Sequence, residues 1–496
     1  MRNPFSPRTP WGRAALAVAL AAALGLASGS CGASGGAGRS AVATSGASTL
    51  APATRAFADT VERRAFDFFW ELSDARTGLT PDRWPTRSFA SVAAMGFALT
   101  AYPIGAERGW VPREAAAERT LATLRFLWTA RQDTASAGAT GYRGFFYHFL
   151  RPEDGTRFEK VELSSMDTAL LMGGVLFCGE YFAGATGTER EVRALADSLY
   201  RRVDWTWLQV RPPVMALGWS PEEGHLPYDW RGYNEAMLLH VLALGSPTHP
   251  VGPEVWPAFT SRYRWGEFEG EPHVNFSPLF GHQYSHCWID FRGIRDDFMR
   301  EHDLDYFENS RRATLAQRAY AIRNPGGFAG YGADVWGLSA CDGPVDATFT
   351  IDGRERRFRT YAARGASLLE IVDDGTLSPT AAGGSVAFTP EISLAALAEM
   401  KRRYGDALWG RYGFFDAFNP TLRLPVRVQH GRVDPKLGWF DIDWLGIDQG
   451  PILVMIENER SGLVWKTLQR SPHLRRGLAA AGFRGGWLDT PAPAAR

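Results

Sequence analysis

Net charge is absent from this chain, and cysteine is scarce. Lysine plus arginine and aspartate plus glutamate number 54 each among 496 residues. No basic surplus exists to hold nucleic acid or an anionic membrane surface, so the composition favours a neutral partner. Of the four cysteines, Cys178, Cys287 and Cys341 follow the amino-terminal segment. This odd, widely spaced set argues against a disulfide framework, although Cys287 and Cys341 could form one bridge.

The motifs of acyl transfer and of zinc binding are also missing. The one Gly-x-Ser-x-Gly run, 32–36, lies in the Gly, Ala and Ser-rich segment with no strand predicted before it and is no nucleophile elbow, and no cysteine has a matching histidine and asparagine setting. His282 and His286 stand four residues apart, as on one face of a metal-binding helix, but no glutamate follows His282 in the zinc-protease manner. No third ligand stands nearby. We therefore expect no metal, and interpret both histidines as ligand-binding or core-edge residues.

The first 31 residues have the layout of a secretory signal. Arginines precede an apolar stretch, Ala14 to Ala27, and small residues lead from it to Cys31. The stretch is too short to predict a transmembrane span. Residues 28–31 resemble a bacterial lipoprotein cleavage box, although Ser28 stands where leucine is expected. We expect a lipoprotein-type signal peptide over 1–31, with simple secretion as the alternative, and a flexible linker rich in Gly, Ala and Ser over 32–56.

From Phe57 onward the apolar residues recur at three- and four-residue spacing, which predicts helix after helix in one domain over 57–490. The expected helices span 57–72, 91–101, 112–130, 165–182, 189–203, 235–243, 284–291, 307–324, 390–404, 451–468 and 472–481. Strand-like alternation is confined to 143–150, 211–219 and 348–359. The pattern predicts a mainly α fold, an (α/α)6 toroid with short strands in inserted loops. Periodicity does not separate a toroid from an α-solenoid.

Four acidic residues, Glu162, Asp167, Glu235 and Asp448, stand where apolar helical runs begin. A carboxylate there has a structural explanation, because it caps free N–H groups and favours the positive end of the helix dipole. Glu235 and Asp448, however, also lie among aromatic residues, in 228–235 (YDWRGYNE) and 439–448 (WFDIDWLGID). Aromatic faces stack on sugar rings and paired carboxyls carry out glycoside cleavage, so we predict a sugar-binding cleft.

Several longer motifs resemble a known family. They are 282–286 (HQYSH), 288–292 (WIDFR), 308–311 (ENSR) and 327–332 (GFAGYG), which are similar to the bacterial glycoamylase-like domain. Together with 165–171 (SMDTALL), 233–236 (YNEA) and 446–451 (GIDQGP), they resemble glycoside hydrolase family 144. The resemblance spans roughly 57–486.

That resemblance implies an (α/α)6 barrel, no cofactor, and inverting endo-hydrolysis of β-1,2-glucan to short sophoro-oligosaccharides. Related members act from chain ends on sophorose units, so the resemblance leaves endo against exo action open. The older label of glucoamylase-like protein implies α-glucan, which we favour less.

We predict Glu235 as the general acid and Asp448 as the general base, with reversed roles as an alternative and Asp167 as a second candidate base. The setting of Glu235 between Tyr233 and apolar residues would raise its pKa by desolvation. The predicted substrate-binding residues are Glu162, Tyr233, His282, Tyr284, His286, Trp288, Arg292 and Trp444. Arg292, beside Phe291, could also fix the ionisation of a carboxylate by pairing with it.

Two rival functions remain at this point. A lipid-anchored glycan-binding protein would need the same aromatic residues but no matched carboxyl pair. A polysaccharide lyase would need an anionic substrate, and the neutral chain lacks a concentrated basic groove. We expect an exported monomer, a periplasmic or outer-membrane lipoprotein or else a secreted protein, that meets the membrane only through an amino-terminal lipid and binds a neutral glucan.

Overall fold

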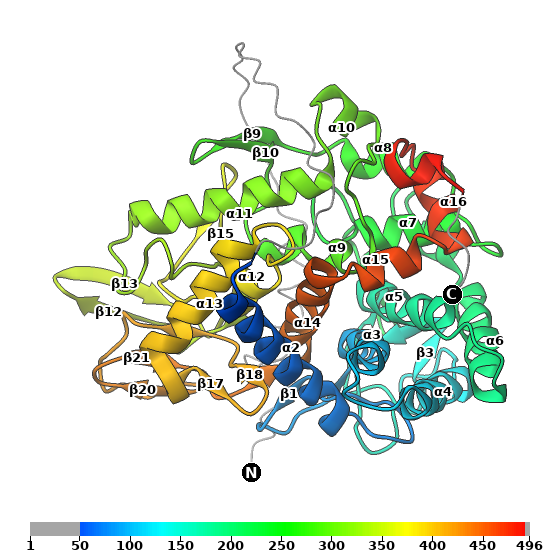
Figure 1. Cartoon of the computed structure of the whole chain (residues 1–496), viewed down its shortest axis with the longest axis horizontal. Helices are drawn as coiled ribbons and strands as arrows, with labels where there is room; N and C mark the ends of the chain where they lie inside the picture. Colours follow the sequence, from blue (N-terminus) through cyan, green and yellow to red (C-terminus); the bar gives the residue numbers. More distant parts are fainter. Residues whose placement is uncertain (1–49, 492–496) are drawn as a thin grey trace.

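The computed structural model describes residues 50–491, and the long apolar repeats of the sequence form helices there (Figure 1). The longer helices are α2 (Pro52–Leu72), α3 (Val92–Glu107), α4 (Arg113–Thr129), α5 (Ser165–Tyr181), α6 (Gly187–Arg202), α7 (Met237–Gly245), α11 (Tyr306–Arg323), α13 (Pro390–Tyr404), α14 (Gly446–Arg460) and α16 (Pro472–Ala480). The shorter ones are α8 (Val255–Thr260), α9 (Tyr284–Trp288), α10 (Asp297–Glu301), α12 (Pro379–Gly383) and α15 (Leu463–Leu468). The predicted mainly helical class is confirmed.

Several predicted boundaries differ from the structure. Helix α2 begins at Pro52, so the end of the predicted linker is helical; proline suits the first turn because its missing N–H has no partner there. The signal peptide, Cys31 and the rest of the linker lie outside the described residues. The run predicted from Pro451 begins earlier, at Gly446, and divides into α14 and α15. The sequence did not predict helices α8, α10 and α12, because they are too short to show a helical period.

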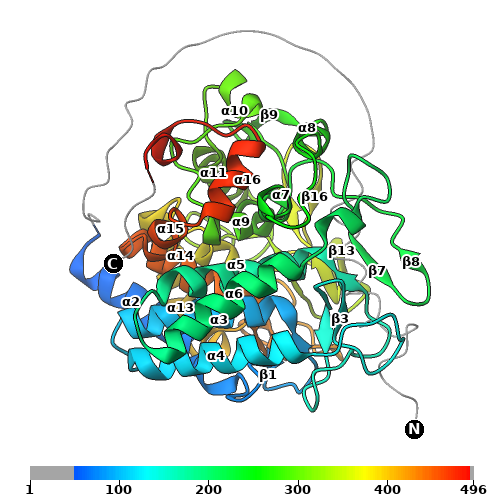
Figure 2. The same ribbon diagram turned by 90° about the vertical axis from the view of Figure 1, so that its right-hand side faces the viewer.

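The helices fall into two kinds. Residues 92–105 of α3 and 165–178 of α5 are buried on every side, and α7 is wholly buried. Helix α6 instead buries one face and exposes the other, and α2, α4 and α16 also expose part of their surface. A helix that is apolar all round must lie inside, whereas an amphipathic one covers it. Figure 2 shows α3, α4, α5 and α6 side by side.

Helices α3 and α5 pack backbone against backbone. A methyl group on Gly96 would lie 2.5 Å from the carbonyl oxygen of Leu170, and one on Gly174 would lie 2.2 Å from the carbonyl oxygen of Gly96. Neither contact leaves room for a side chain. The two glycines therefore set how closely the inner helices approach each other.

All strands are short and antiparallel. The largest sheet has the order β3 (Gly141–Tyr142), β4 (Phe145–Tyr147), β6 (Leu163–Ser164), β7 (Gly218–Ser220), β8 (Gly224–His225). A three-stranded sheet joins β19 (Phe418–Asn419), β21 (Gly438–Phe440) and β20 (Arg432–Asp434). The strand pairs are β1 (Arg83–Trp84) with β22 (Trp444–Leu445), β2 (Ala90–Ser91) with β5 (Phe149–Leu150), β9 (Trp265–Phe268) with β10 (Glu271–Val274), β11 (Ala340–Asp342) with β14 (Tyr361–Ala363), β12 (Ala347–Ile351) with β13 (Arg354–Phe358), β15 (Gly365–Ala366) with β16 (Ile371–Val372), and β17 (Trp409–Gly410) with β18 (Gly413–Phe414).

Three of these strands lead straight into inner helices. Strand β2 ends where α3 begins, β6 where α5 begins and β22 where α14 begins. Figure 2 shows β3 and β7 at one end of the helices. The predicted strand over 211–219 is limited to its last residues, where β7 starts. The fold thus places a short strand directly before the first residue of each of these three helices.

The question of a Cys287–Cys341 bridge is settled within residues 50–491. Cys287 and Cys341 are both buried and free, so the bridge between them does not form. No helix in this range has the length and apolar character needed to cross a membrane.

Candidate active site

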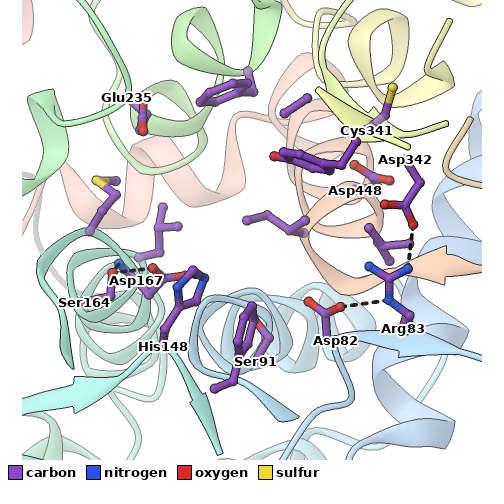
Figure 3. Close-up of a pocket in the computed structure, with 18 of the residues that line it drawn as sticks. Asp82, Arg83, Ser91, His148, Ser164, Asp167, Glu235, Cys341, Asp342 and Asp448 are labelled. Atoms are coloured by element: carbon purple, nitrogen blue, oxygen red, sulfur yellow. Dashed lines mark hydrogen bonds and ion pairs between the residues drawn. The ribbon is translucent and has the colours of Figure 1, made fainter. Parts of the chain in front are cut away.

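A pocket opens where α3, α5 and α14 begin (Figure 3). Ser91, Asp167 and Asp448 reach it from the starts of these three helices. Part of its remaining lining is aromatic and comes from short strands, short helices and loops: Phe89, Phe149, Trp230, Phe280, Tyr284 and Tyr361. The pocket therefore combines carboxyl groups with flat apolar faces.

One wall of the pocket is organised by a histidine. His148 Nδ1 lies 2.8 Å from Glu162 Oε1, and His148 Nε2 lies 3.5 Å from Asp167 Oδ1. Burial by itself would lower the pKa of His148, but the charges of Asp167 and Glu162 outweigh it and raise that pKa to about 9. The burial of Glu162 would raise its own pKa, yet the His148 charge holds that pKa below its ordinary value. The histidine is therefore a cation that two carboxylates share.

Asp167 owes its position to the start of α5. Ser164 is the N-cap of this helix, and its hydroxyl accepts a hydrogen bond from the Asp167 backbone N–H at 3.1 Å. The same hydroxyl donates a hydrogen bond to the Asp167 carboxylate. Ser164 thus caps the helix through its hydroxyl and, with the same hydroxyl, holds the carboxylate of the third helical residue. Asp167 is thus both a cap and a lining residue of the pocket.

Glu235 lies on the same wall, just before α7. Its side chain is 3 % exposed, and its Oε2 has no hydrogen-bond partner among residues 50–491. Ser285 fixes its backbone by donating a hydrogen bond to the Glu235 carbonyl oxygen at 2.7 Å. Burial raises the pKa of Glu235 to about 7, and the negative charge of Asp167 adds to the effect. A carboxyl group in this setting keeps its proton near neutral pH.

Asp448 belongs to the opposite wall, as the third residue of α14. Its Oδ2 has no hydrogen-bond partner among the described residues. Burial raises the pKa of Asp448 to about 8; a hydrogen bond with Asp416 opposes this rise, and the negative charges of Asp342 and Asp82 add to it. Carboxyl groups crowd this wall.

Arg83 is the main cation of the second wall. Its guanidinium lies 2.6 Å from Asp342 Oδ2, 3.1 Å from Asp82 Oδ2 and 3.9 Å from Asp443 Oδ2. Burial opposes the charged form of Arg83, but the negative charges of Asp342, Asp82 and Asp441 raise its pKa well above the ordinary value. Figure 3 shows the two walls facing each other, with Glu235, Asp167 and His148 on one side and Asp448, Asp342 and Arg83 on the other.

The pocket brings together five of the predicted site residues: Glu162, Asp167, Glu235, Tyr284 and Asp448. The other six are not among its lining residues, and we no longer propose that they contact substrate: Tyr233, His282, His286, Trp288, Arg292 and Trp444. Each has a structural partner elsewhere in the chain.

The histidine pair and Tyr233 belong to the core. His282 Nε2 lies 3.1 Å from the Phe276 carbonyl oxygen, and His286 Nε2 lies 3.1 Å from Ser310 Oγ. Tyr233 packs on His282 with ring centroids 4.8 Å apart. Burial lowers the pKa of His286 to about 3, so it stays neutral. The four-residue spacing placed both histidines in the interior rather than at the pocket.

Trp288, Arg292 and Trp444 are likewise engaged elsewhere. Trp288 Nε1 donates a hydrogen bond to Thr100 at 3.1 Å, and Trp444 Nε1 donates one to the Gly413 carbonyl oxygen at 3.0 Å. Arg292 pairs with Asp290 at 2.7 Å, a carboxylate of its own segment. Of the aromatic neighbours around Glu235, Trp230 lines the pocket and Tyr233 does not, so proximity along the chain was an incomplete guide to the aromatic lining.

Sequence reasoning missed Asp82, Arg83, His148 and Asp342, which line the pocket from strands and loops. His148 stands between Tyr147 and Phe149, so the aromatic setting used for Glu235 could have indicated it. Asp82, Arg83 and Asp342 do not stand at the start of a helix, so the pattern that indicated Asp167 and Asp448 did not indicate them.

Carboxyl groups on two facing walls of an aromatic pocket define a class of protein, the glycoside hydrolases that work by acid and base. The glycoamylase family model, described as "Putative glucoamylase", matches residues 227–472. A structure from Bacteroides uniformis that is described in the same words is 30% identical, with a TM-score of 0.75; the match covers 89% of this chain and 100% of that one. The chain belongs to the glycoamylase family of glycoside hydrolases, as the sequence motifs predicted.

Two other relatives carry more specific descriptions. The endo-β-1,2-glucanase from Chitinophaga pinensis, solved with sophorotriose and glucose, is 28% identical with a TM-score of 0.74, over 88% of this chain and 100% of that one. An exo β-1,2-glucooligosaccharide sophorohydrolase (non-reducing end) of Parabacteroides distasonis is 28% identical over 472 residues, which is 88% of this chain. The chain spans 59% of the length of that curated relative.

Proposed function

We propose that this protein hydrolyses β-1,2-linked glucan to short sophoro-oligosaccharides. One observation carries the proposal: Glu235 and Asp448 present carboxyl groups from facing walls of one pocket. The names of the two more specifically described relatives support the linkage, since both act on β-1,2-linked glucose chains. A neutral glucan also suits a chain without net charge.

Glu235 acts as the general acid. A general acid must hold its proton at working pH and reach the glycosidic oxygen. The pKa of Glu235, raised to about 7 by burial, meets the first condition, and its unpartnered Oε2 is available for the second. Asp167 supports the acid by its charge, which raises the pKa of Glu235, and does not itself react.

Asp448, rather than Asp167, acts as the general base. In an inverting hydrolase the base activates water on the face of the sugar opposite the acid. Asp167 lies on the same wall as Glu235 and is paired with His148, 3.5 Å away. Asp448 lies on the opposite wall, with Oδ2 without a hydrogen-bond partner among the described residues. Because burial raises the pKa of Asp448 to about 8, the acting form is the fraction of the protein in which Asp448 is ionised while Glu235 is still protonated.

A substrate panel tests the function. Purified protein is incubated with β-1,2-, β-1,3-, β-1,4- and α-1,4-glucans, and the products are separated by thin-layer chromatography. We expect oligosaccharides from β-1,2-glucan alone. Binding without cleavage would indicate a glycan-binding protein, and unsaturated products from a uronate polymer would indicate a lyase.

The same digestion tests the mode of attack. A spread of chain lengths in the first minutes would show endo action. Release of sophorose alone would show the exo action that the name of the Parabacteroides distasonis relative describes.

The anomeric configuration of the product tests whether the acid and the base act from facing walls. Proton NMR of the first minutes of hydrolysis should show the α-anomer at the new reducing end, because water attacks from the face opposite the leaving group. An initial β-anomer would indicate a retaining mechanism with a carboxylate nucleophile, and would overturn the pairing of Glu235 with Asp448.

We also propose that the helices close into an (α/α)6 toroid. The wholly buried helix α7 and the almost wholly buried helices α3 and α5, together with the partly exposed α2, α4, α6 and α16, support this arrangement. A crystal structure in which the inner helices do not form a closed ring would contradict it.

For the amino-terminal segment we propose export with a lipid on Cys31. The arginines, the apolar stretch and the small residues before Cys31 support this. Mass spectrometry of membrane-fraction protein should find diacylglycerol on Cys31, and Cys31→Ser should release the protein into the soluble fraction. A soluble enzyme cleaved elsewhere would leave secretion standing and exclude the anchor.

A further inference from the structure

We propose that Asp342, Asp416 and Asp441 form a binding site for a divalent cation of the calcium type, behind the Asp448 wall of the pocket. One carboxylate oxygen from each of the three residues lies within 4.8 Å of the others. Calcium holds oxygen ligands at about 2.4 Å, so two ligands on opposite sides of one ion are about 4.8 Å apart. The three oxygens therefore fit around a single ion.

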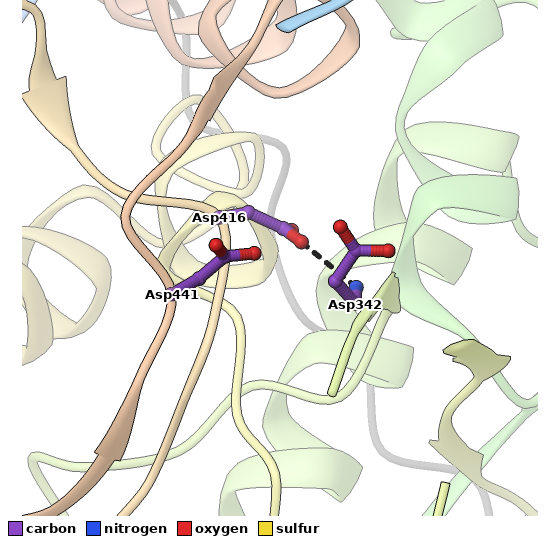
Figure 4. Close-up of side chains that lie close together, drawn as sticks. All are labelled: Asp342, Asp416 and Asp441. Atoms are coloured by element: carbon purple, nitrogen blue, oxygen red, sulfur yellow. Dashed lines mark hydrogen bonds between the residues drawn. The ribbon is translucent and has the colours of Figure 1, made fainter. Parts of the chain in front are cut away.

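The three aspartates come from separate segments. Asp342 ends β11, Asp416 lies just before β19, and Asp441 directly follows β21. Figure 4 shows their side chains converging from these segments. Hydrogen bonds from backbone N–H groups already hold these segments together, from the Asp441 N–H to the Ala417 carbonyl oxygen at 2.9 Å and from the Asp342 N–H to Asp416 at 2.8 Å, so the three carboxylates are brought together before any cation binds.

A buried oxygen without a partner points to a ligand. Asp416 and Asp441 are each 1 % exposed. One oxygen of each carboxylate is held. Asp416 Oδ2 accepts a hydrogen bond from the Asp342 N–H at 2.8 Å, and Asp441 Oδ1 accepts one from the Ile442 N–H at 2.6 Å. Each carboxylate is thus fixed by one oxygen. Asp416 also forms a hydrogen bond with Asp448, so Asp441 Oδ2 is the buried oxygen of the cluster that is left wholly without a partner among residues 50–491.

The arginines near the cluster, Arg83 and Arg364, also pair with carboxylates outside it. Arg83 bridges Asp342 at 2.6 Å and Asp82 at 3.1 Å, and Arg364 pairs with Asp374 at 2.8 Å. Asp416 and Asp441 form no ion pair within 4.0 Å among the described residues. Buried carboxylates without compensation are costly, so the cluster needs either a cation or protons.

The chemistry of the ligands selects the ion. All three are hard carboxylate oxygens, which suit calcium or magnesium rather than zinc or copper. Calcium tolerates irregular geometry and a mixed set of protein and water ligands, whereas magnesium demands a near-ideal octahedron. The sequence analysis predicted no metal, and the His282 and His286 pair that it considered lies in the core instead.

Binding can be measured without any substrate, so its failure is distinguishable from failure of the proposed hydrolysis. The full chain is stripped with EDTA, dialysed, and titrated with Tb³⁺ while sensitised emission is followed, and Ca²⁺ is then added as competitor. We expect saturable emission that calcium suppresses. In parallel, calcium should raise the melting temperature relative to EDTA, because an ion that binds only the folded state stabilises it.

Two variants and one control locate the site. Asp441→Asn should lose both the terbium emission and the calcium-dependent rise in melting temperature, and Asp416→Asn should do the same. Asp334→Asn, an exposed aspartate, should behave like the wild type. In EDTA the Asp441→Asn protein should melt at or above the wild type, since the amide removes repulsion within the cluster.

Wild-type measurements alone can overturn the proposal. If calcium neither competes with terbium nor raises the melting temperature, the oxygens hold protons instead, with one shared between Asp416 and Asp448. An unchanged calcium response in both variants would place the ion elsewhere and overturn the site equally.

Discussion

The two walls of the pocket begin alike and each places one cation among carboxylates, but the second wall carries more carboxylates than the first. Asp167 and Asp448 are each the third residue of an inner helix that follows a short strand. On the first wall His148 supplies a positive charge between Glu162 and Asp167, and Glu235 alone stays without a partner for its Oε2. On the second wall several aspartates share Arg83. The role of a helix-start carboxylate is therefore decided by the side chains across from it.

The largest expected effect is the loss of turnover when the reacting carboxyl of either wall is replaced. Glu235→Gln and Asp448→Asn should each lower turnover of β-1,2-glucan about 10²- to 10⁴-fold or more, because each amide keeps the shape and loses proton transfer. Circular dichroism and the melting temperature should stay close to those of the wild type. Glu254→Gln, an exposed glutamate, is the matched control and should keep full activity. A variant that keeps more than about a tenth of the turnover would show that its residue binds or caps.

The pH profile of the wild type tests the state of the first wall. Glu235 must be protonated to act as acid, and its pKa is raised to about 7. Because Asp448, the base, must also be ionised and its pKa is raised to about 8, we expect a bell-shaped kcat/KM with its maximum between about pH 7 and pH 8 and a fall of about tenfold for each further pH unit on the alkaline side. Initial rates on a soluble β-1,2-glucan measure this. An alkaline limb near the ordinary glutamate pKa would mean that Glu235 is not the acid.

A smaller effect should follow from Asp167→Asn. The negative charge of Asp167 raises the pKa of Glu235, so its removal should lower that pKa and move the alkaline limb of kcat/KM to lower pH. At acidic pH much of the rate should remain. A profile that keeps its shape while the rate falls at every pH would instead favour Asp167 as the base.

The smallest effect concerns stability. The folded-state pKa of His148 is raised to about 9 from an ordinary 6.5, so its ion pairs contribute stability that is fully present below about pH 6.5 and lost as pH rises through 9. His148→Gln should therefore lower the free energy of unfolding by about 1–3 kcal/mol at pH 6, as loss of one partner of a charged hydrogen bond does. The difference from the wild type should shrink above pH 9 in urea titrations. A difference independent of pH would mean that His148 acts by packing alone.

Much of the architecture could be predicted because it depends on local patterns. The spacing of apolar residues marked α2, α4 and α13 to within a few residues, since a helix buries a face that repeats along the chain. The same reasoning found Asp167 and Asp448, because a helix start favours a carboxylate. It misplaced His286 and Trp288, whose spacing and neighbours did not tell pocket from core.

The sequence by itself determined the mainly helical class, the family and the carboxylates at the starts of α5 and α14, because each rests on residues close together in the chain. Only the tertiary structure decided that Asp342, Asp416 and Asp441 converge, that Arg83 lies among carboxylates and that His148 bridges two of them. These contacts join segments far apart in the chain, which no spacing or period records. The raised pKa of Glu235 also depends on the tertiary structure. Burial and the negative charge of Asp167 raise it, and both arise only in the folded chain.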